Sequence, residues 1–377
     1  MISEIEEKTH RLSEMLKSER LAGVLLNAQH NFAWLTAGGS NGIDLSRDNG
    51  ASFLFVRADG KRFVMANNIE LPRLLAEEVS EANFEPLELS WQEEKASLDA
   101  VLSAADSLWN GGEIASDLYL SPRLRPIDGL IAACRYRLTA DEIERYRRLG
   151  VDAGEALGEL AATISPGETE IEIARKVQSK LAGHNIASVV TLVGADERIE
   201  RYRHPVPTQN VWKTTLLIAV CARRGGLIAS LSRIVCVGDI PAELERRTEA
   251  VAVVNAKLQA ATVPGAKASD LYQIAASAYA KLGFADEIDK HHQGGACGYR
   301  TRDWVAHPAN GESVKPNQAF AWNPSITGTK AEATGIVLKG RFAAITSASG
   351  FPQIVTTIDG NDYSSPGILS LSKGVSA

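Results

Sequence analysis

Several residues that could do chemistry lie together in the stretch HHQGGACGYRTRDW at positions 291–304. It holds two histidines, a cysteine, two arginines and three glycines. Imidazole groups transfer protons near neutral pH and bind metals, and guanidinium groups bind carboxylates through paired hydrogen bonds. The composition of this loop therefore indicates proton transfer, anion binding or metal binding.

The two histidines of the loop are adjacent, as His291 and His292. In an extended segment neighbouring side chains point in opposite directions, so we expect His291 to face a site and His292 to be structural. Arg300 and Arg302 are separated by one residue, which would place both on one side of a strand to hold a substrate carboxylate; a solvent-exposed pair is the alternative. Two further candidates for substrate contact follow them, Trp304 and His307.

With 377 residues the chain is long enough for two domains, and its 45% hydrophobic and 23% charged residues are typical of a globular protein. A net charge of −6 without a basic stripe argues against nucleic acid as a partner. No apolar run approaches the roughly 20 residues that span a bilayer, and the N-terminus lacks the apolar core of a signal peptide. Four scattered cysteines without a CxxC pair indicate reduced thiols, so we expect a cytoplasmic protein without membrane contact.

The pattern of hydrophobic residues divides the chain near residue 136. Residues 1–136 alternate short apolar runs with helical spacing, and Asp59–Gly60 marks a hairpin, which predicts an α/β domain. A capping box of Thr139 and Glu142 then indicates the first helix of a second domain, residues 137–377.

The second domain contains two similar stretches. Pro-Gly at 166–167 and at 264–265 is followed each time by a Thr or Ser suited to cap a helix and then by an amphipathic helix. This spacing favours an internal duplication, with coincidence as the alternative. The β-rich runs between the helices predict an antiparallel sheet, so the expected layout is α+β with a central cavity.

The order of motifs along the chain resembles the creatinase, prolidase and aminopeptidase P family. The motifs are NFAWLT at 31–36, RHP at 203–205, the hairpin LLIAVCARRGGLIASLSRIVCVG at 216–238, the HHQGG loop, AFAWNPSI at 319–326 and TKAEAT at 329–334. The resemblance implies an N-terminal α/β domain followed by a pseudo-symmetric pita-bread domain with a curved antiparallel sheet.

Metal-dependent members of that family hold two metal ions through two aspartates, a histidine and two glutamates. The matching positions of this chain are Ala219, Ser230, Gly295, Asn323 and Glu332. A divalent ion needs several converging anionic or imidazole ligands, so we expect no metal and no cofactor at these positions. A glycine where the family has a metal-binding histidine would also leave space that substrate could occupy.

Histidines that contact substrate in the family match His204 and His291. Creatinase is a member that works without metal, and its proton-transferring histidine matches His204. The resemblance thus implies His204, His291 and Glu332 as catalytic groups. Two neutral polar side chains join the substrate-binding candidates, Ser230 and Asn323. Dimeric relatives cover one subunit's pocket with the N-terminal domain of the other, which implies a homodimer with Arg47 over the neighbouring site.

These expectations combine into one function. We expect a metal-independent, creatinase-like hydrolase that cleaves a C–N bond, of an amide or amidine, in a small carboxylate-bearing metabolite. Two alternatives stay open on the same fold: a metal-dependent Xaa-Pro aminopeptidase or dipeptidase, and a non-catalytic binding module. A lyase or deaminase that uses the same histidines is a third.

Overall fold

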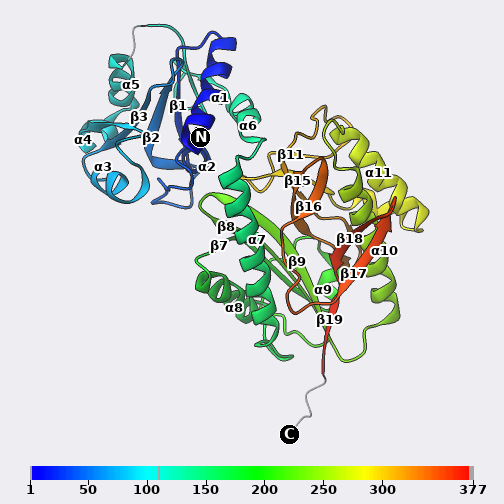
Figure 1. Cartoon of the computed structure of the whole chain (residues 1–377). Helices are drawn as coiled ribbons and strands as arrows, with labels where there is room; N and C mark the ends of the chain where they lie inside the picture. Colours follow the sequence, from blue (N-terminus) through cyan, green and yellow to red (C-terminus); the bar gives the residue numbers. More distant parts are fainter. Residues whose placement is uncertain (1, 109–110, 373–377) are drawn as a thin grey trace. The chain divides into compact units, whose positions relative to one another are not determined.

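The computed structural model describes residues 2–108 and 111–372, and the chain divides into two compact units, Met1–Asp141 and Glu142–Ala377 (Figure 1). The division lies in the first turn of helix α7, Ala140–Ala161. Within the described residues, no helix combines the length and the apolar character that crossing a lipid bilayer requires.

A mixed sheet of six strands, in the order β4-β3-β2-β1-β5-β6, forms the first unit. The central strand β1 is buried along its whole length and pairs antiparallel with β2 and parallel with β5. The predicted hairpin at Asp59–Gly60 is confirmed, because β2 and β3 pair antiparallel across it and Gly60 has a φ of 90°, which glycine adopts at little cost. The strands are β1 Gly23–Ala28, β2 Asn49–Arg57, β3 Arg62–Asn67, β4 Glu85–Leu89, β5 Ile114–Ser116 and β6 Arg125–Pro126.

Helices of the first unit begin and end where local sequence dictates. A capping box starts the first helix, since Ser3 Oγ accepts from the Glu6 N–H at 3.3 Å and the Glu6 carboxylate accepts from the Ser3 N–H at 2.8 Å. The helix that begins at Leu71 continues as a π turn and ends at Glu78, because the backbone of the following Val79 is extended. The helices are α1 Glu4–Ser18, α2 Gln29–Leu35, α3 Leu71–Arg73, η1 Leu74–Glu78, α4 Trp91–Ala96, α5 Leu98–Ser107 and α6 Asp128–Arg135.

The second unit repeats one order of elements, a helix pair followed by strands, as a pseudo-symmetric pita-bread fold requires. Figure 1 shows the pair α7–α8 and the pair α10–α11 flanking the strands. Each pair is joined through a Pro-Gly turn in which the glycine has a positive φ, 100° at Gly167 and 90° at Gly265. The helices after α7 are α8 Glu170–Gly183, α9 Glu197–Arg201, α10 Ala242–Ala261, α11 Ala268–Lys281 and the 3₁₀ helix η2 Ala285–Asp289.

The two repeats differ in how their second helix starts. Thr169 caps α8 in a full capping box with Glu172, as the sequence predicts. The serine expected to cap the other helix lies inside it, because α11 already begins at Ala268 and its N-cap Lys267 makes no side-chain capping bond. The lysine backbone instead forms a bridge with Ser313, which fixes the start of the helix.

Two sheets fill the space between the helix pairs, with the orders β19-β9-β8-β7 and β11-β10-β12-β15-β16. Strand β9 joins them, since the Ile228 N–H donates to Gly298 O at 2.8 Å and the Ser232 N–H donates to Glu332 O at 3.3 Å. The strands are β7 Ala187–Ala195, β8 Thr215–Arg224, β9 Leu227–Val237, β10 Gly294–Cys297, β11 Trp304–Val305, β12 Ala319–Trp322, β13 Ser325–Ile326, β14 Thr329–Lys330, β15 Ala333–Leu338, β16 Arg341–Ala344, β17 Gln353–Ile358, β18 Asn361–Pro366 and β19 Ile368–Leu371.

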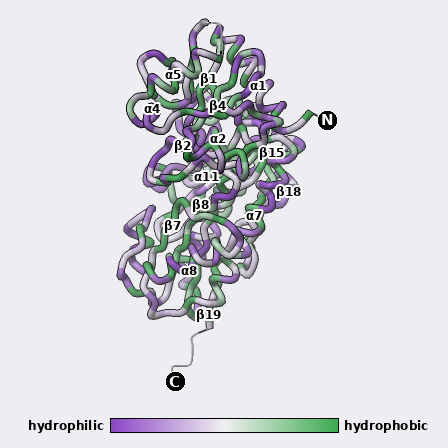
Figure 2. The backbone as a smooth tube through the Cα atoms, turned by 90° about the vertical axis from the view of Figure 1, so that its left-hand side faces the viewer, coloured by the Kyte–Doolittle hydropathy of each residue, from purple (hydrophilic) through white to green (hydrophobic). Residues whose placement is uncertain are grey.

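Apolar strands supply the core of the second unit. Figure 2 shows hydrophobic stretches along strands such as β8, whereas the helices alternate hydrophobic and hydrophilic residues. In β12 the rings of Phe320 and Trp322 stack with their centroids 5.6 Å apart, and Trp322 Nε1 donates to Thr262 Oγ1 at 3.0 Å. These rigid strands position the loops that end beside the central pocket.

Candidate functional site

A pocket of about 160 Å³ lies in the second unit, between its two sheets. Strands β7 and β8 contribute small apolar side chains, and segments of the second repeat contribute nearly all of the polar ones. The lining residues are Val190, Leu192, His204, Ala219, Val220, Cys221, His292, Thr301, Arg302, Asn323, Lys330 and Glu332. Catalytic and binding chemistry in this pocket therefore depends on a few groups.

Three imidazole rings meet at this pocket. His204 follows α9 in the loop before β8, and His291 and His292 follow η2. The Nε2 atoms of His204 and His291 are 3.2 Å apart, so one of them donates a hydrogen bond to the other. The rings of His291 and His292 stack with centroids 4.4 Å apart and planes 25° apart.

The stacked pair corrects one expectation from the sequence. His291 lies in a bend directly after a 3₁₀ helix, and the alternation of side chains holds only in an extended segment. Both histidines therefore lie at the site, and it is His292 that lines the pocket while His291 contacts His204. His292 is a site residue that the sequence argument assigned to structure.

The environment keeps these imidazoles neutral. Partial burial and the ammonium group of Lys330 lower the pKa of His204 below its ordinary 6.5, against the opposing charge of Glu332. Burial, Lys330 and the adjacent rings lower the pKa of His291 to about 2. Burial and the charges of Arg302 and Lys330 lower the pKa of His292 to about 4. At neutral pH each ring is therefore unprotonated and keeps one ring nitrogen with a free lone pair.

A buried ion triad lies beside the histidines. Lys330 Nζ is 3.1 Å from one oxygen of Glu332, and Arg302 Nη2 is 3.7 Å from the other; the side chains of Lys330 and Glu332 are each 6% exposed. Two cations and one carboxylate leave a net positive charge, which favours an anionic ligand. From the sequence, Glu332 was expected at the site and Lys330 was not. The available signal was that these two are the only charged residues between Gln318 and Lys339.

The dinuclear metal site implied by the family does not fit these residues. Of the five matching positions only Glu332 carries a carboxylate, and Lys330 and Arg302 already neutralise it. The ligand atoms of His204, His291 and His292 lie within 4.8 Å of one another, a spacing that a single ion could use. The charge of Lys330, which disfavours a proton on all three rings, disfavours a metal cation there for the same reason.

Gly295 corrects a second expectation. A Cβ atom at this position would lie 2.1 Å from Trp304 O and 2.9 Å from Val305 Cα, because β11 pairs directly against β10. The backbone of β11 therefore occupies the space that the missing side chain was expected to leave for substrate. Neither a histidine nor a ligand has room there.

Asn323 and Ser230 have different surroundings. Asn323 lines the pocket, and its buried Oδ1 has no hydrogen-bond partner, so a ligand N–H would satisfy an acceptor that is costly to leave unpaired. Ser230 is fully buried in β9 and is not among the lining residues; its Oγ lies 3.4 Å from Cys221 Sγ. Burial also raises the pKa of Cys221, which keeps this thiol protonated.

The two arginines of the loop lie in different surroundings. Arg302 lines the pocket, whereas the exposed Arg300 is not among the lining residues. Trp304 is buried, with its ring 5.4 Å from that of Phe320, and packs in the core. His307 is exposed outside the pocket and accepts from the Ala309 N–H at Nδ1, and Arg47 lies in the first unit, paired with Asp44 at 3.0 Å. The substrate-contact roles of these five residues stay predictions.

Comparisons with solved structures identify the fold. The Xaa-Pro dipeptidase from Bacillus anthracis superposes with a TM-score of 0.76 at 14% identity, over 97% of this chain and all of that one. The prolidase from Pyrococcus furiosus gives 0.73 at 18% identity, over 89% of this chain and 99% of the other. The N-terminal domain of the FACT complex subunit SPT16 from Cicer arietinum gives 0.71 at 12% identity, over 92% and 97%. At these identities the likeness shows the pita-bread fold.

Sequence comparison identifies the family. No curated protein sequence matches this chain significantly. The model of metallopeptidase family M24 matches residues 144–346, which is more than half of the chain and lies within the second unit. The chain therefore belongs to metallopeptidase family M24.

Proposed function

We propose that this protein hydrolyses a C–N bond, of an amide or amidine, in a small carboxylate-bearing metabolite, and that histidines take the place of the metal pair. The single observation that carries the proposal is the neutral His204–His291 pair beside a carboxylate that two cations already neutralise. A neutral imidazole accepts a proton from water, which a protonated one cannot do.

Each pocket group has a role in this reaction. His204 removes a proton from water or passes one to the leaving nitrogen, and His291 orients the ring of His204 through the 3.2 Å contact. Arg302 and Lys330 bind the substrate carboxylate and the oxygen that becomes negative in the transition state. Glu332 holds these two cations in place.

The size of the pocket supports a small substrate. Its volume of about 160 Å³ is below the roughly 300–1,000 Å³ of sites that take drug-sized ligands. The apolar side chains of β7 and β8 leave one end of the substrate without a polar partner. The proposed substrate is therefore a compact molecule with its polar groups toward one side. The homodimer, the cytoplasmic location and a contribution of Arg47 from a second subunit remain parts of this proposal.

Turnover of candidate amide and amidine metabolites tests the proposal, with metal analysis of the same preparation. We expect activity that a chelator leaves unchanged and that His204→Gln lowers by about 10²–10⁴-fold, the usual contribution of a general acid–base group. Activity that requires stoichiometric manganese or zinc would instead support a metal-dependent Xaa-Pro peptidase, the alternative toward which the similarity to the Xaa-Pro dipeptidase from Bacillus anthracis points. Product analysis separates a hydrolase from a lyase or deaminase.

A non-catalytic binding module is the second candidate. The similarity to the N-terminal domain of SPT16, a subunit of the FACT complex, favours it. In that case the pocket histidines do no chemistry. His204→Gln would then leave the biological effect of the protein unchanged, whereas the hydrolase proposal requires that effect to be lost.

A further inference from the structure

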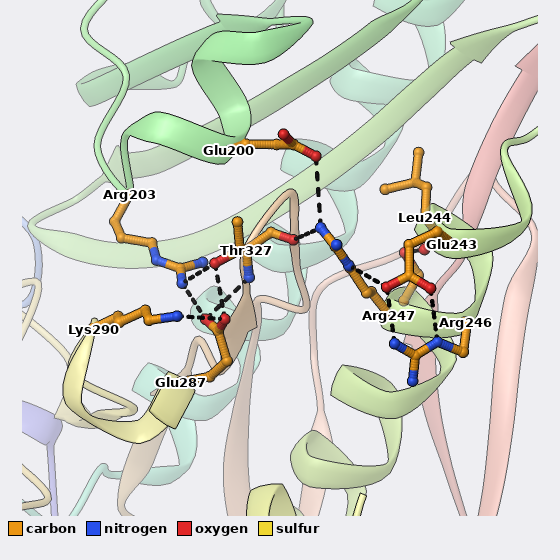
Figure 3. Close-up of polar contacts among 10 residues, drawn as sticks. Glu200, Arg203, Glu243, Leu244, Arg246, Arg247, Glu287, Lys290 and Thr327 are labelled. Atoms are coloured by element: carbon orange, nitrogen blue, oxygen red, sulfur yellow. Dashed lines mark hydrogen bonds and ion pairs between the residues drawn. The ribbon is translucent and has the colours of Figure 1, made fainter. Parts of the chain in front are cut away.

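One buried carboxylate outside the pocket gathers donors from three segments of the chain. Glu287, in η2, accepts a hydrogen bond from Arg203, one from Lys290 Nζ at 3.0 Å, and two from Thr327, through its N–H at 3.1 Å and its Oγ1 at 2.8 Å (Figure 3). Arg203 also donates to Thr327 Oγ1 at 3.1 Å. The side chain of Glu287 is 8% exposed.

Two partners of Glu287 directly precede the contacting histidines, and the third begins the turn that leads to Lys330. Arg203 directly precedes His204, and Lys290 directly precedes His291. Thr327 lies in the turn between β13 and β14, and β14 ends at Lys330. One carboxylate therefore connects the three segments that bring the first histidine, the second histidine and the catalytic cation together.

The chemistry of this cluster suits positioning better than stabilisation. Taking charges out of water costs several kcal/mol per ion, so a buried ion pair contributes little net stability, yet removing one partner leaves the other unpaired. Hydrogen bonds to Lys290 and Thr327 and the charge of Arg203 nevertheless outweigh the effect of burial and lower the pKa of Glu287, so it stays charged. The charged hydrogen bonds of Glu287 join three segments and fix the distances between them. Apolar contacts alone have no such directional preference.

A second carboxylate in Figure 3 provides the contrast. Glu243 pairs with Arg246 at 2.8 Å and with Arg247 at 2.7 Å, all three on α10, and its side chain is 51% exposed. Arg247 also donates to Thr327 O at 3.0 Å. The two ion pairs of Glu243 itself are therefore local and screened by solvent, and contact with other segments is made by Arg247, which also lies 3.6 Å from Glu200.

We propose that Glu287 is a positioning residue that sets the contact between His204 and His291 and the place of Lys330 beside them. The use of this geometry in hydrolysis rests on the proposed function, but the geometry itself does not. The isosteric change Glu287→Gln keeps the shape and removes the charge that holds Arg203 and Lys290. His204 and His291 are then no longer held Nε2 to Nε2.

The tautomers of the two histidines report this contact. In the pair, one Nε2 carries the hydrogen and the other accepts it, so the accepting ring carries its hydrogen on Nδ1. A neutral histidine free of such a contact prefers the hydrogen on Nε2. Nitrogen NMR of the full chain labelled on histidine distinguishes the two forms, whether or not the protein hydrolyses anything.

We expect wild type to show one of the two rings fixed in the Nδ1–H form, and Glu287→Gln to lose that signal while its near-ultraviolet circular dichroism stays that of a folded protein. Glu243→Gln is the matched control and should keep the wild-type signals. Unchanged tautomers in Glu287→Gln, or an equal change in Glu243→Gln, would overturn the proposal.

A second variant decides the matter if Glu287→Gln does not fold. Arg203→Lys keeps the positive charge but cannot reach both Glu287 and Thr327 as the guanidinium does. Loss of the Nδ1–H signal in folded Arg203→Lys supports the positioning role, and its retention rejects it. A negative result in the hydrolysis assays leaves either outcome intact.

Discussion

The two repeats of the second unit share one order of elements but contribute opposite chemistry to the pocket. Strands β7 and β8 of the first repeat supply an apolar wall, to which Leu192 and Ala219 belong. The second repeat supplies a charged wall with His292, Arg302 and Lys330. Apolar contacts limit the size of a ligand but do not orient it, because they are non-directional. Charged groups and imidazoles orient a ligand and transfer protons. The two repeats thus have the same order of elements, but the charged and reactive side chains of the pocket come mainly from the second repeat.

His204 is the exception to this division. It belongs to the first repeat, yet it contacts His291, and its neighbour Arg203 pairs with Glu287. The first repeat thus contributes its one reactive group only where ion pairs attach it to the second.

The largest effect should come from the charged wall. Lys330→Met removes a buried cation and leaves Glu332 only Arg302, at 3.7 Å, so we expect a loss of unfolding free energy below the about 3–5 kcal/mol of a buried charge left with no partner. We also expect loss of turnover, because the cation that faces the substrate is gone. Urea unfolding and turnover measure the two effects.

The triple variant Arg302→Met, Lys330→Met and Glu332→Met separates them, because removing Lys330 and Glu332 alone would leave Arg302 without its carboxylate. Replacing every member of a buried ion cluster by apolar side chains is often neutral for stability. Recovery of the unfolding free energy without recovery of activity is the expected result. An active triple variant would contradict a catalytic role for the charged wall.

A substitution in the apolar wall should have a smaller effect, and it should change KM more than kcat. Ala219→Leu fills part of the pocket of about 160 Å³ without touching a polar group. We expect KM to rise about tenfold, roughly 1.4 kcal/mol, with kcat little changed, because room for substrate is lost while proton transfer is not. Steady-state kinetics check this, and a fall in kcat at constant KM would show that the wall takes part in chemistry.

The smallest effect is expected on the free energy of unfolding at acid pH. The folded-state pKa of His291, about 2, lies below its ordinary 6.5, so the unfolded chain binds this proton first. The contribution to stability is complete above pH 6.5 and is lost as pH falls toward 2, with a slope of at most about 1.4 kcal/mol per pH unit. Urea unfolding at pH 7, 6 and 5 should show a shallower slope in His291→Gln than in wild type; equal slopes would refute the assignment.

The sequence by itself determined the fold of this protein and the kind of chemistry available. Hydrophobic periodicity, the capping boxes and the Pro-Gly turns are local signals, and they predicted helix pairs around an antiparallel sheet. The motif order indicated the M24 family, and the types of residue at 204, 291 and 332 indicated proton transfer and anion binding.

Tertiary structure alone decided which of those residues meet. His204 and His291 are 87 positions apart, and their 3.2 Å contact depends on how whole segments pack. The bend after η2 turned His292 into the pocket, the pairing of β10 with β11 closed the space at Gly295, and the segment between these strands brought Arg302 to Glu332. Local propensity specifies an element, but the distance between two side chains on different elements is set by packing and by buried charges such as Glu287, and neither can be read from residue spacing.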